Sequence, residues 1–251
     1  MSVQPLDRAG RLDRPAFYAR HGGISTDLVS LLHPPYTAWH LSYVVLGAVA
    51  APRVHGDRLG AALLAFFLAV GVGAHAFDEL HDRPLRTSLS NRTLAITGSV
   101  ALLGATGIGV AGIATVSLTL APLVLFGTAI CLTYNLELFG GRFHNDAWFA
   151  IAWGAFPALT GYWVNALSVS LAGGLLIAAC AGFSVLQRRL STPARLLRRR
   201  TAAVNGEQRL DDGTSIELSR SVLLAPLDGA LQAMSVAITF LAAGLLAVRL
   251  P

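Results

Sequence analysis

The sequence predicts an all-α membrane protein, a polytopic bundle of about seven transmembrane helices. Hydrophobic residues make up 54% of the 251 residues and charged residues only 13%, whereas an average soluble domain carries about 25% charge. The apolar residues also form long blocks, and the mean hydropathy is +0.58. These properties exclude an ordinary water-soluble globule and a disordered chain.

A helix that crosses about 30 Å of hydrocarbon needs about 20 apolar residues. Residues 1–35 are polar and are predicted to form a cytoplasmic N-terminal segment. The transmembrane domain then covers residues 36–251, with a polar cytoplasmic loop at 187–221. The predicted spans are 36–52, 59–80, 94–114, 116–138, 147–164, 167–186 and 222–248.

The arginines predict the orientation of the chain. All 19 basic residues are Arg, and all but Arg53, Arg58 and Arg249 fall on one side when seven spans are drawn. Because cytoplasmic loops carry an excess of positive residues, the N-terminus is predicted inside and the C-terminus outside. We therefore expect an integral protein of a bacterial or archaeal plasma membrane. The net charge of +5 does not indicate nucleic acid, since the arginines lie beside apolar segments.

Acidic residues gather at the end of the second predicted span. At 100° per residue, His75, Asp78, Glu79 and Asp82 fall within about 100° of one helix face. Carboxylates stacked in this way are costly near hydrocarbon unless a cation lies among them. Mg²⁺ prefers carboxylate and water oxygens and bridges to phosphates. Two alternatives are a salt-bridge network without a ligand and a transition-metal site that includes His75.

Basic residues follow the acidic cluster directly. Arg83, Arg86 and Arg92 lie within ten positions of it, and Pro84 ends the helix. Guanidinium groups bind phosphate oxygens in a bidentate manner. Carboxylates for a metal beside arginines for phosphate form a diphosphate site in outline.

The segments FDELHD and RPLRT, residues 77–87, resemble the motifs of the UbiA superfamily of intramembrane prenyltransferases. Residues 132–163 are similar to the family's next conserved region, with Tyr134, Pro157 and Gly161 as matching positions. The resemblance covers residues 30–190. It departs from the family pattern at Phe77 and His81, where the family has Asn and Asp.

The resemblance implies Mg²⁺-dependent transfer of a prenyl group from an isoprenoid diphosphate to a small or lipid acceptor within the bilayer. Asp78 and Asp82 would hold the metal, with Glu79 as a further ligand. Arg83 and Arg86 would take part in catalysis at the diphosphate. The predicted substrate-binding residues are Glu79, Arg92, Tyr134, Asn135, Arg188 and Arg189.

The second acidic motif of the family has no counterpart here. Residues 183–200 contain no acid and instead carry Gln187, Arg188, Arg189 and Arg195 among their polar residues. In one interpretation these arginines neutralise a diphosphate directly. In the other they set topology and bind anionic lipid. The missing motif also leaves an alternative function, an inactive UbiA-fold protein that binds lipid or assembles with partners in a membrane complex.

Smaller features complete the prediction. Asn145 or Asp146 suits the N-cap of the fifth span. Asn-Gly and Asp-Gly pairs within residues 204–216 predict a β-hairpin. Asp228, an acid inside the last span, is a candidate functional residue.

Overall fold

A computed structural model describes residues 14–19 and 22–249 of the chain. Among these residues, five helical segments are long and apolar enough to cross a membrane. They are Gly56–Asp82, Asn91–Thr115, Leu118–Asn135, Leu171–Arg199 and Arg220–Arg249. The all-α membrane fold is therefore confirmed at this level.

The elements follow one another in an almost wholly helical order. The first half contains α2 (Ile24–Leu31), α3 (Pro34–Ala50), α4 (Gly56–Phe66), η1 (Phe67–Ala74), α5 (His75–Asp82), α6 (Asn91–Thr115), η2 (Leu118–Leu120) and α7 (Ala121–Asn135). The second half contains α8 (Asp146–Ala150), η3 (Ile151–Ala155), α9 (Phe156–Ala166), α10 (Leu171–Arg199), β1 (Glu207–Arg209), β2 (Ser215–Glu217) and α11 (Arg220–Arg249). The predicted first and fifth spans coincide with α3 and with the α8–η3–α9 unit, whose crossing of the bilayer stays a prediction.

Local side chains fix where several helices begin and end. The Asn145 side chain accepts a hydrogen bond from the Trp148 amide (3.0 Å), which confirms the predicted N-cap. Ser90 caps α6 in the same way through the Thr93 amide (3.0 Å). The long helical segment Gly56–Asp82 ends at Asp82, because Arg83 adopts a left-handed conformation (φ 51°) just before Pro84.

Helices α3 and α9 cross with their backbones in close contact. A Cβ atom placed on Gly47 would lie 2.0 Å from the Ala158 carbonyl oxygen. A Cβ atom on Gly161 would lie 2.0 Å from the Val44 carbonyl oxygen. Glycine is therefore required on both helices, as is common where membrane helices pack tightly.

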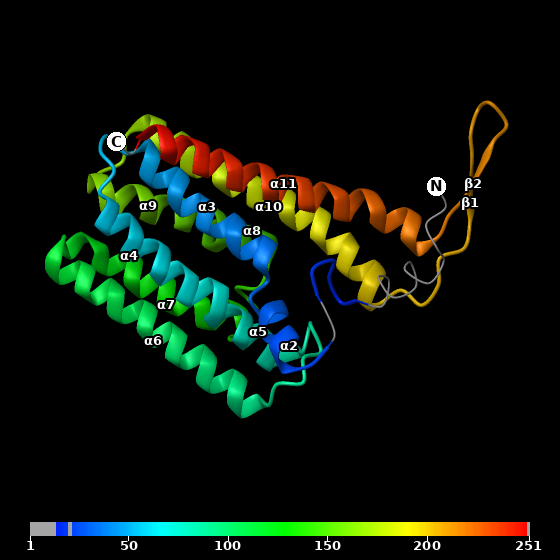
Figure 1. The fold of residues 1–251 in the computed structure, drawn as a ribbon, viewed down its shortest axis with the longest axis horizontal. Coiled ribbons are helices and arrows are strands. Elements are labelled where there is room, and N and C mark those ends of the chain that lie inside the picture. Colours follow the sequence, from blue (N-terminus) through cyan, green and yellow to red (C-terminus); the bar gives the residue numbers. More distant parts are fainter. Residues whose placement is uncertain (1–13, 20–21, 250–251) are drawn as a thin grey trace.

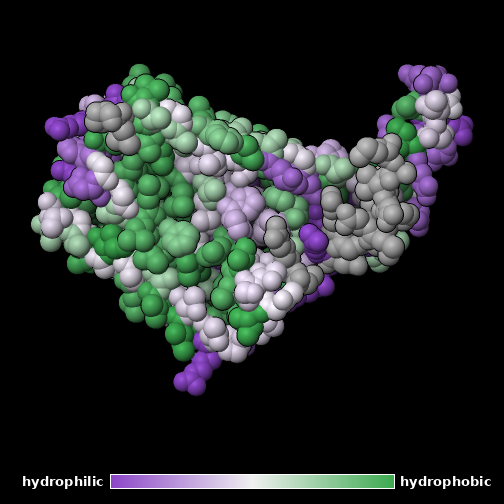
Figure 2. Space-filling view, in the orientation of Figure 1, coloured by the Kyte–Doolittle hydropathy of each residue, from purple (hydrophilic) through white to green (hydrophobic). Residues whose placement is uncertain are grey.

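The bundle carries an extension at one end (Figure 1). Helices α10 and α11 run side by side past the other helices, and the β1–β2 hairpin projects beyond them. Hydrophobic side chains cover much of the visible face of the bundle, while hydrophilic ones gather around the hairpin and at the opposite edge (Figure 2). This distribution is the one expected of a protein embedded in lipid.

The polar segment 187–221 is less loop-like than the sequence suggests. Helix α10 does not end at residue 186 but continues to Arg199. The residues that extend it are mainly Arg and Leu, which favour helices, and the buried positions Gln187, Ser191 and Ala194 follow a helical spacing. The predicted hairpin is confirmed, with Glu207 opposite Glu217 in antiparallel register.

Candidate functional site

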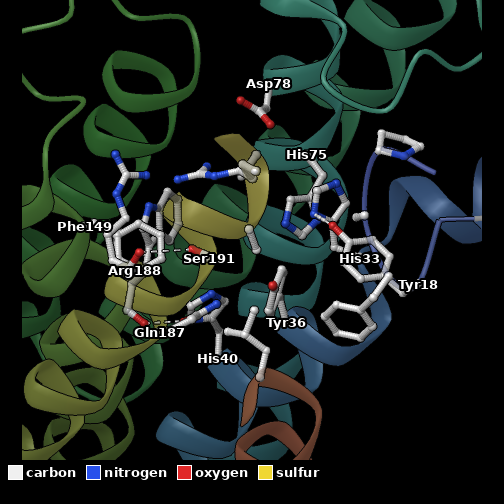
Figure 3. Close-up of a pocket in the computed structure, with 18 of the residues that line it drawn as sticks. Tyr18, His33, Tyr36, His40, His75, Asp78, Phe149, Gln187, Arg188 and Ser191 are labelled. Atoms are coloured by element: carbon white, nitrogen blue, oxygen red, sulfur yellow. Dashed lines mark hydrogen bonds between the residues drawn. The ribbon is translucent and has the colours of Figure 1, made fainter. Parts of the chain in front are cut away.

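A polar cavity of about 140 Å³ lies where α3, α5, α7 and α10 meet the segment 14–19 (Figure 3). Its walls combine basic, aromatic and a few acidic side chains. Of the described residues, those with polar side chains that line it are Tyr18, His33, Tyr36, His40, His75, Asp78, Tyr134, Asn135, His144, Gln187, Arg188, Ser191, Arg195, Arg198, Arg199 and Asp228, together with the indole of Trp153.

One face of α10 makes the cavity basic. Arg188, Arg195, Arg198 and Arg199 line it at spacings of three, four and seven residues, which place side chains on one side of a helix. Arg198 pairs with Asp228 of α11. The cavity thus holds four arginines against the carboxylates of Asp78 and Asp228, an excess of positive charge in the described part of the site.

The Arg188 side chain is anchored on three sides. Its Nε donates to Asp146 Oδ1 (2.8 Å), and its Nη1 donates to the Tyr134 hydroxyl (3.4 Å). Its Cζ lies 5.4 Å from the centre of the Phe149 ring. These contacts hold the guanidinium plane at the cavity wall.

Histidines and a tyrosine form the wall next to the N-terminal segment. The His33 and His75 rings stack with centroids 3.9 Å apart, and the Tyr18 hydroxyl lies 2.7 Å from His33 Nδ1. Burial, and then the neighbouring His75, hold the pKa of His33 well below its usual value. Burial raises the pKa of the Tyr18 hydroxyl, so the hydroxyl keeps its proton. At neutral pH, the His33 and Tyr18 side chains of this wall are therefore uncharged.

Gln187 presents a buried acceptor at the cavity. Its residue is 3% exposed, and its Oε1 atom has no hydrogen-bond partner within the described part of the chain. A buried polar atom without a partner costs free energy. Such an atom in a cavity wall is a feature of a site that a ligand or water completes.

The three carboxylates predicted to share a metal point to different surroundings. Asp78 lines the cavity. Glu79 is fully buried, and its oxygens accept hydrogen bonds from the Leu85 amide (2.8 Å), the Thr87 amide (2.7 Å) and the Thr87 hydroxyl (2.9 Å). Asp82 is exposed and is not among the residues that line the cavity. Although the three residues share a 100° arc of the helix, Asp78 faces the cavity, Glu79 holds the loop that follows, and Asp82 lies at the surface.

The described residues do not gather the three predicted magnesium ligands around one point. Glu79 already serves the loop 83–88, and Asp78 is the one predicted ligand at the cavity. Over residues 14–19 and 22–249, no group of three His, Cys, Asp or Glu side chains is arranged to hold a metal ion. The arginines of α10 would also repel a divalent cation beside them.

The arginines predicted to bind phosphate after the acidic cluster lie away from the cavity lining. Arg83 folds back on its own loop, where it donates to the Leu89 carbonyl (2.7 Å) and to the Asn91 side chain. Arg86 and Arg92 are exposed. Of the other predicted substrate-binding residues, Tyr134, Asn135 and Arg188 line the cavity, whereas Arg189 is exposed.

A second, apolar cavity of about 330 Å³ shares two lining residues with the first. It lies among α4, α6, α7 and α9 and extends to Asp57 and Arg58 at the start of α4. Val70 and Trp153 line both cavities. They lie in η1 and η3, the two π-helical segments of the described chain. Such segments are rare and often mark functional sites.

Sequence reasoning missed several residues of this site. In one interpretation of the sequence the basic stretch after residue 186 neutralises a diphosphate, but not as one face of a continuous helix, because the end of the apolar run hid the helical spacing of Arg195, Arg198 and Arg199. No comparable signal exists for Val70 or Tyr18, because only the tertiary fold brings them to the cavities. Comparison of the chain with protein-family models, with curated proteins and with solved structures gave no match.

Proposed function

We propose that the protein binds an isoprenoid diphosphate and transfers its prenyl group to an acceptor within the membrane, as a divergent UbiA-like enzyme. The observation that carries this proposal is that Val70 and Trp153 line both a basic cavity and an apolar one. We call this shared boundary the junction. An isoprenoid diphosphate has the same two parts, a multiply charged head and an apolar tail. The resemblance in residues 77–87 and 132–163 supports the same substrate.

The basic cavity suits the head of such a ligand. Arginines are the side chains best matched to phosphate oxygens, because the guanidinium group offers several donors in one plane. The positive excess of the cavity would stabilise the charge that builds on a departing diphosphate. The His33–His75 wall adds no competing negative charge.

The apolar cavity suits the tail. Its lining is dominated by Ala, Val, Leu, Ile and Phe side chains of α4, α6, α7 and α9. From Val70 to Asp57 the helical segment Gly56–Asp82 rises about 20 Å, at 1.5 Å per residue. A chain of several isoprene units can lie along that length, shielded from water.

The proposed reaction needs one bond broken and one formed. The carbon–oxygen bond at C1 of the prenyl chain breaks, and the diphosphate leaves with the electron pair. The allylic cation then bonds to a nucleophilic carbon of the acceptor, and that carbon loses a proton. In this proposal Asp78 accepts the proton, while the surrounding side chains would keep water from the cation.

Mg²⁺ stays a prediction from the family resemblance, since the described carboxylates are not gathered around one point. The seven-span topology, with α3 and the α8–η3–α9 unit crossing the membrane, is likewise part of the proposal. It would place the basic cavity on the cytoplasmic side, in agreement with the excess of arginines there.

The test uses purified protein in detergent and radiolabelled geranylgeranyl diphosphate. We expect saturable binding that geranylgeraniol alone and inorganic pyrophosphate alone displace much less well than the complete ligand. Incubation with a membrane lipid extract should then release pyrophosphate and yield a labelled lipid product. Failure of farnesyl and geranylgeranyl diphosphate to bind under any condition would refute the proposal.

A second candidate function is binding of a prenyl diphosphate without chemistry, in an assembly or carrier role. The dispersal of Asp78, Glu79 and Asp82 favours it, because catalytic members of the family depend on clustered acids. Tight binding with no release of pyrophosphate from any acceptor mixture would identify this role.

A further inference from the structure

We infer that the arginine face of α10 binds a diphosphate group directly, without a bridging metal ion. The inference rests on the proposed function and specifies how its site would recognise the head of the ligand. Its basis is the arrangement of Arg188, Arg195, Arg198 and Arg199 around a cavity that holds one carboxylate of the predicted metal set.

The available donors support direct binding. A guanidinium group has five N–H donors. Arg195 uses one of them for Thr192 Oγ1 (3.3 Å), and Arg199 uses its Nε for the Pro15 carbonyl oxygen (3.4 Å), as far as the described residues show. Most donors of these two side chains therefore remain for a ligand, and phosphate oxygens are strong acceptors for them.

The charges at the cavity favour an anion over a cation. Asp228 neutralises one arginine through its ion pair with Arg198. Asp146 pairs with Arg188 from an exposed position outside the cavity lining. With Asp78 counted as well, the lining keeps a surplus of positive charge that a diphosphate would balance and a divalent cation would increase.

The spacing of the arginines favours a diphosphate over a single phosphate. From Arg188 to Arg199 the axis of α10 rises about 16 Å, with Arg195 between them. A head with two linked phosphate groups can contact more of these guanidinium groups at once than a monophosphate can. A glycerophospholipid headgroup offers one phosphate and is therefore a weaker ligand for this face.

The first experiment needs no variant. Equilibrium binding of radiolabelled geranylgeranyl diphosphate is measured with excess EDTA and again with millimolar Mg²⁺. We expect the two dissociation constants to agree within about threefold, which is less than 1 kcal/mol. Binding that requires Mg²⁺ would overturn the inference but leave the proposed function intact, whereas absence of binding in both buffers would refute the function itself.

Substitutions in the cavity then distinguish direct binding by arginines from binding through a bridging metal ion. Arg195→Gln and Arg199→Gln should each weaken binding in EDTA by about 10- to 100-fold, the usual effect of losing a charged hydrogen bond. Arg142→Gln, at an exposed arginine outside the cavity, is the matched control and should leave binding unchanged. Equal binding by all three variants would contradict the inference.

Asp78→Asn is expected to change the affinity for the diphosphate in opposite directions in a metal site and in an arginine site. If Asp78 held a metal, its loss would weaken binding of the diphosphate. In an arginine site without metal, removal of its negative charge should make binding tighter, and weaker binding by the folded variant counts against the inference. A final experiment measures competition with phosphatidylglycerol vesicles. If the vesicles displace labelled geranylgeranyl diphosphate as effectively as inorganic pyrophosphate does, the arginine face is a surface for lipid headgroups instead.

Discussion

Val70 and Trp153 each line both the basic and the apolar cavity, and each lies in a π-helical segment. The two segments belong to helical units that are far apart in the sequence. In a π-helical turn the side chains shift relative to the regular helical pattern. Both helical units therefore depart from ideal α-helical geometry at the residues that the two cavities share.

This relationship predicts that Val70→Trp separates head binding from tail binding. The larger side chain should obstruct the junction, so that geranylgeranyl diphosphate binds at least about tenfold more weakly, since each CH₂ kept from burial costs about 0.8 kcal/mol. Binding of inorganic pyrophosphate should stay within twofold. Val72→Trp, in the same segment but outside both cavity linings, is the control. Equal losses for both ligands would refute the idea of a passage at Val70.

The Glu79 carboxylate is predicted to stabilise the fold. Glu79→Gln removes one acceptor oxygen and turns an amide group toward the Leu85 and Thr87 donors. We expect a loss of about 1–3 kcal/mol in the free energy of unfolding, measured by denaturant titration in detergent. Glu217→Gln, at an exposed strand position, should change little. A Glu79→Gln protein of unchanged stability that had lost a Mg²⁺-dependent activity would favour the metal-ligand role instead.

His33 predicts a loss of stability in mild acid. Its pKa is lowered in the folded protein, whereas in the unfolded chain it titrates near the ordinary value of about 6.5. Below that pH the unfolded chain binds a proton that the folded protein does not, so the free energy of unfolding falls as the pH drops.

The measurement is thermal unfolding between pH 7.5 and pH 5. His33→Asn, which tolerates the left-handed backbone at this position (φ 45°), should unfold at a temperature that depends less on pH. His81→Asn, at an exposed site, controls for the loss of any histidine. An unchanged pH profile for His33→Asn would contradict this account.

The crossing of α3 and α9 predicts a marked effect of one methyl group. Gly161→Ala would force its Cβ against the Val44 carbonyl oxygen, so the helices must separate. We expect a destabilisation of about 1–3 kcal/mol, the usual cost of overpacking. Gly182→Ala on α10, where an added Cβ meets open space, should be neutral or slightly stabilising. Thermal unfolding of the two variants side by side tests this expectation.

Much of the fold could be predicted from the sequence, because long apolar blocks have few alternatives in a membrane protein. The Asn145 cap and the hairpin near residue 207 could also be predicted, since both depend on a few adjacent residues. The end of α10 could not, because hydrophobicity stops at residue 186 while the helix continues on Arg and Leu side chains. The length of an apolar run indicates how much of a helix can lie in hydrocarbon, but the helix itself can continue beyond that run.

The site was harder to predict than the fold. Helical spacing correctly placed Asp78, Glu79 and Asp82 on one helix, but a 100° arc is wide enough to face a cavity, a loop and solvent at once. The role of Glu79 depends on the path of residues 83–88, which double back to donate to its oxygens. The neighbourhood of Arg195 and Asp78 depends on how α10 packs, which no local pattern reveals.

The length of α10 has a consequence for how products would leave. Its 29 residues extend about 44 Å, well beyond a hydrocarbon layer of about 30 Å. In the proposed topology, its last turns, with their row of guanidinium groups, would stand near the lipid phosphates. Inorganic pyrophosphate released there could diffuse directly into the aqueous phase. The apolar product could diffuse laterally into the bilayer, so the two products would leave by separate paths.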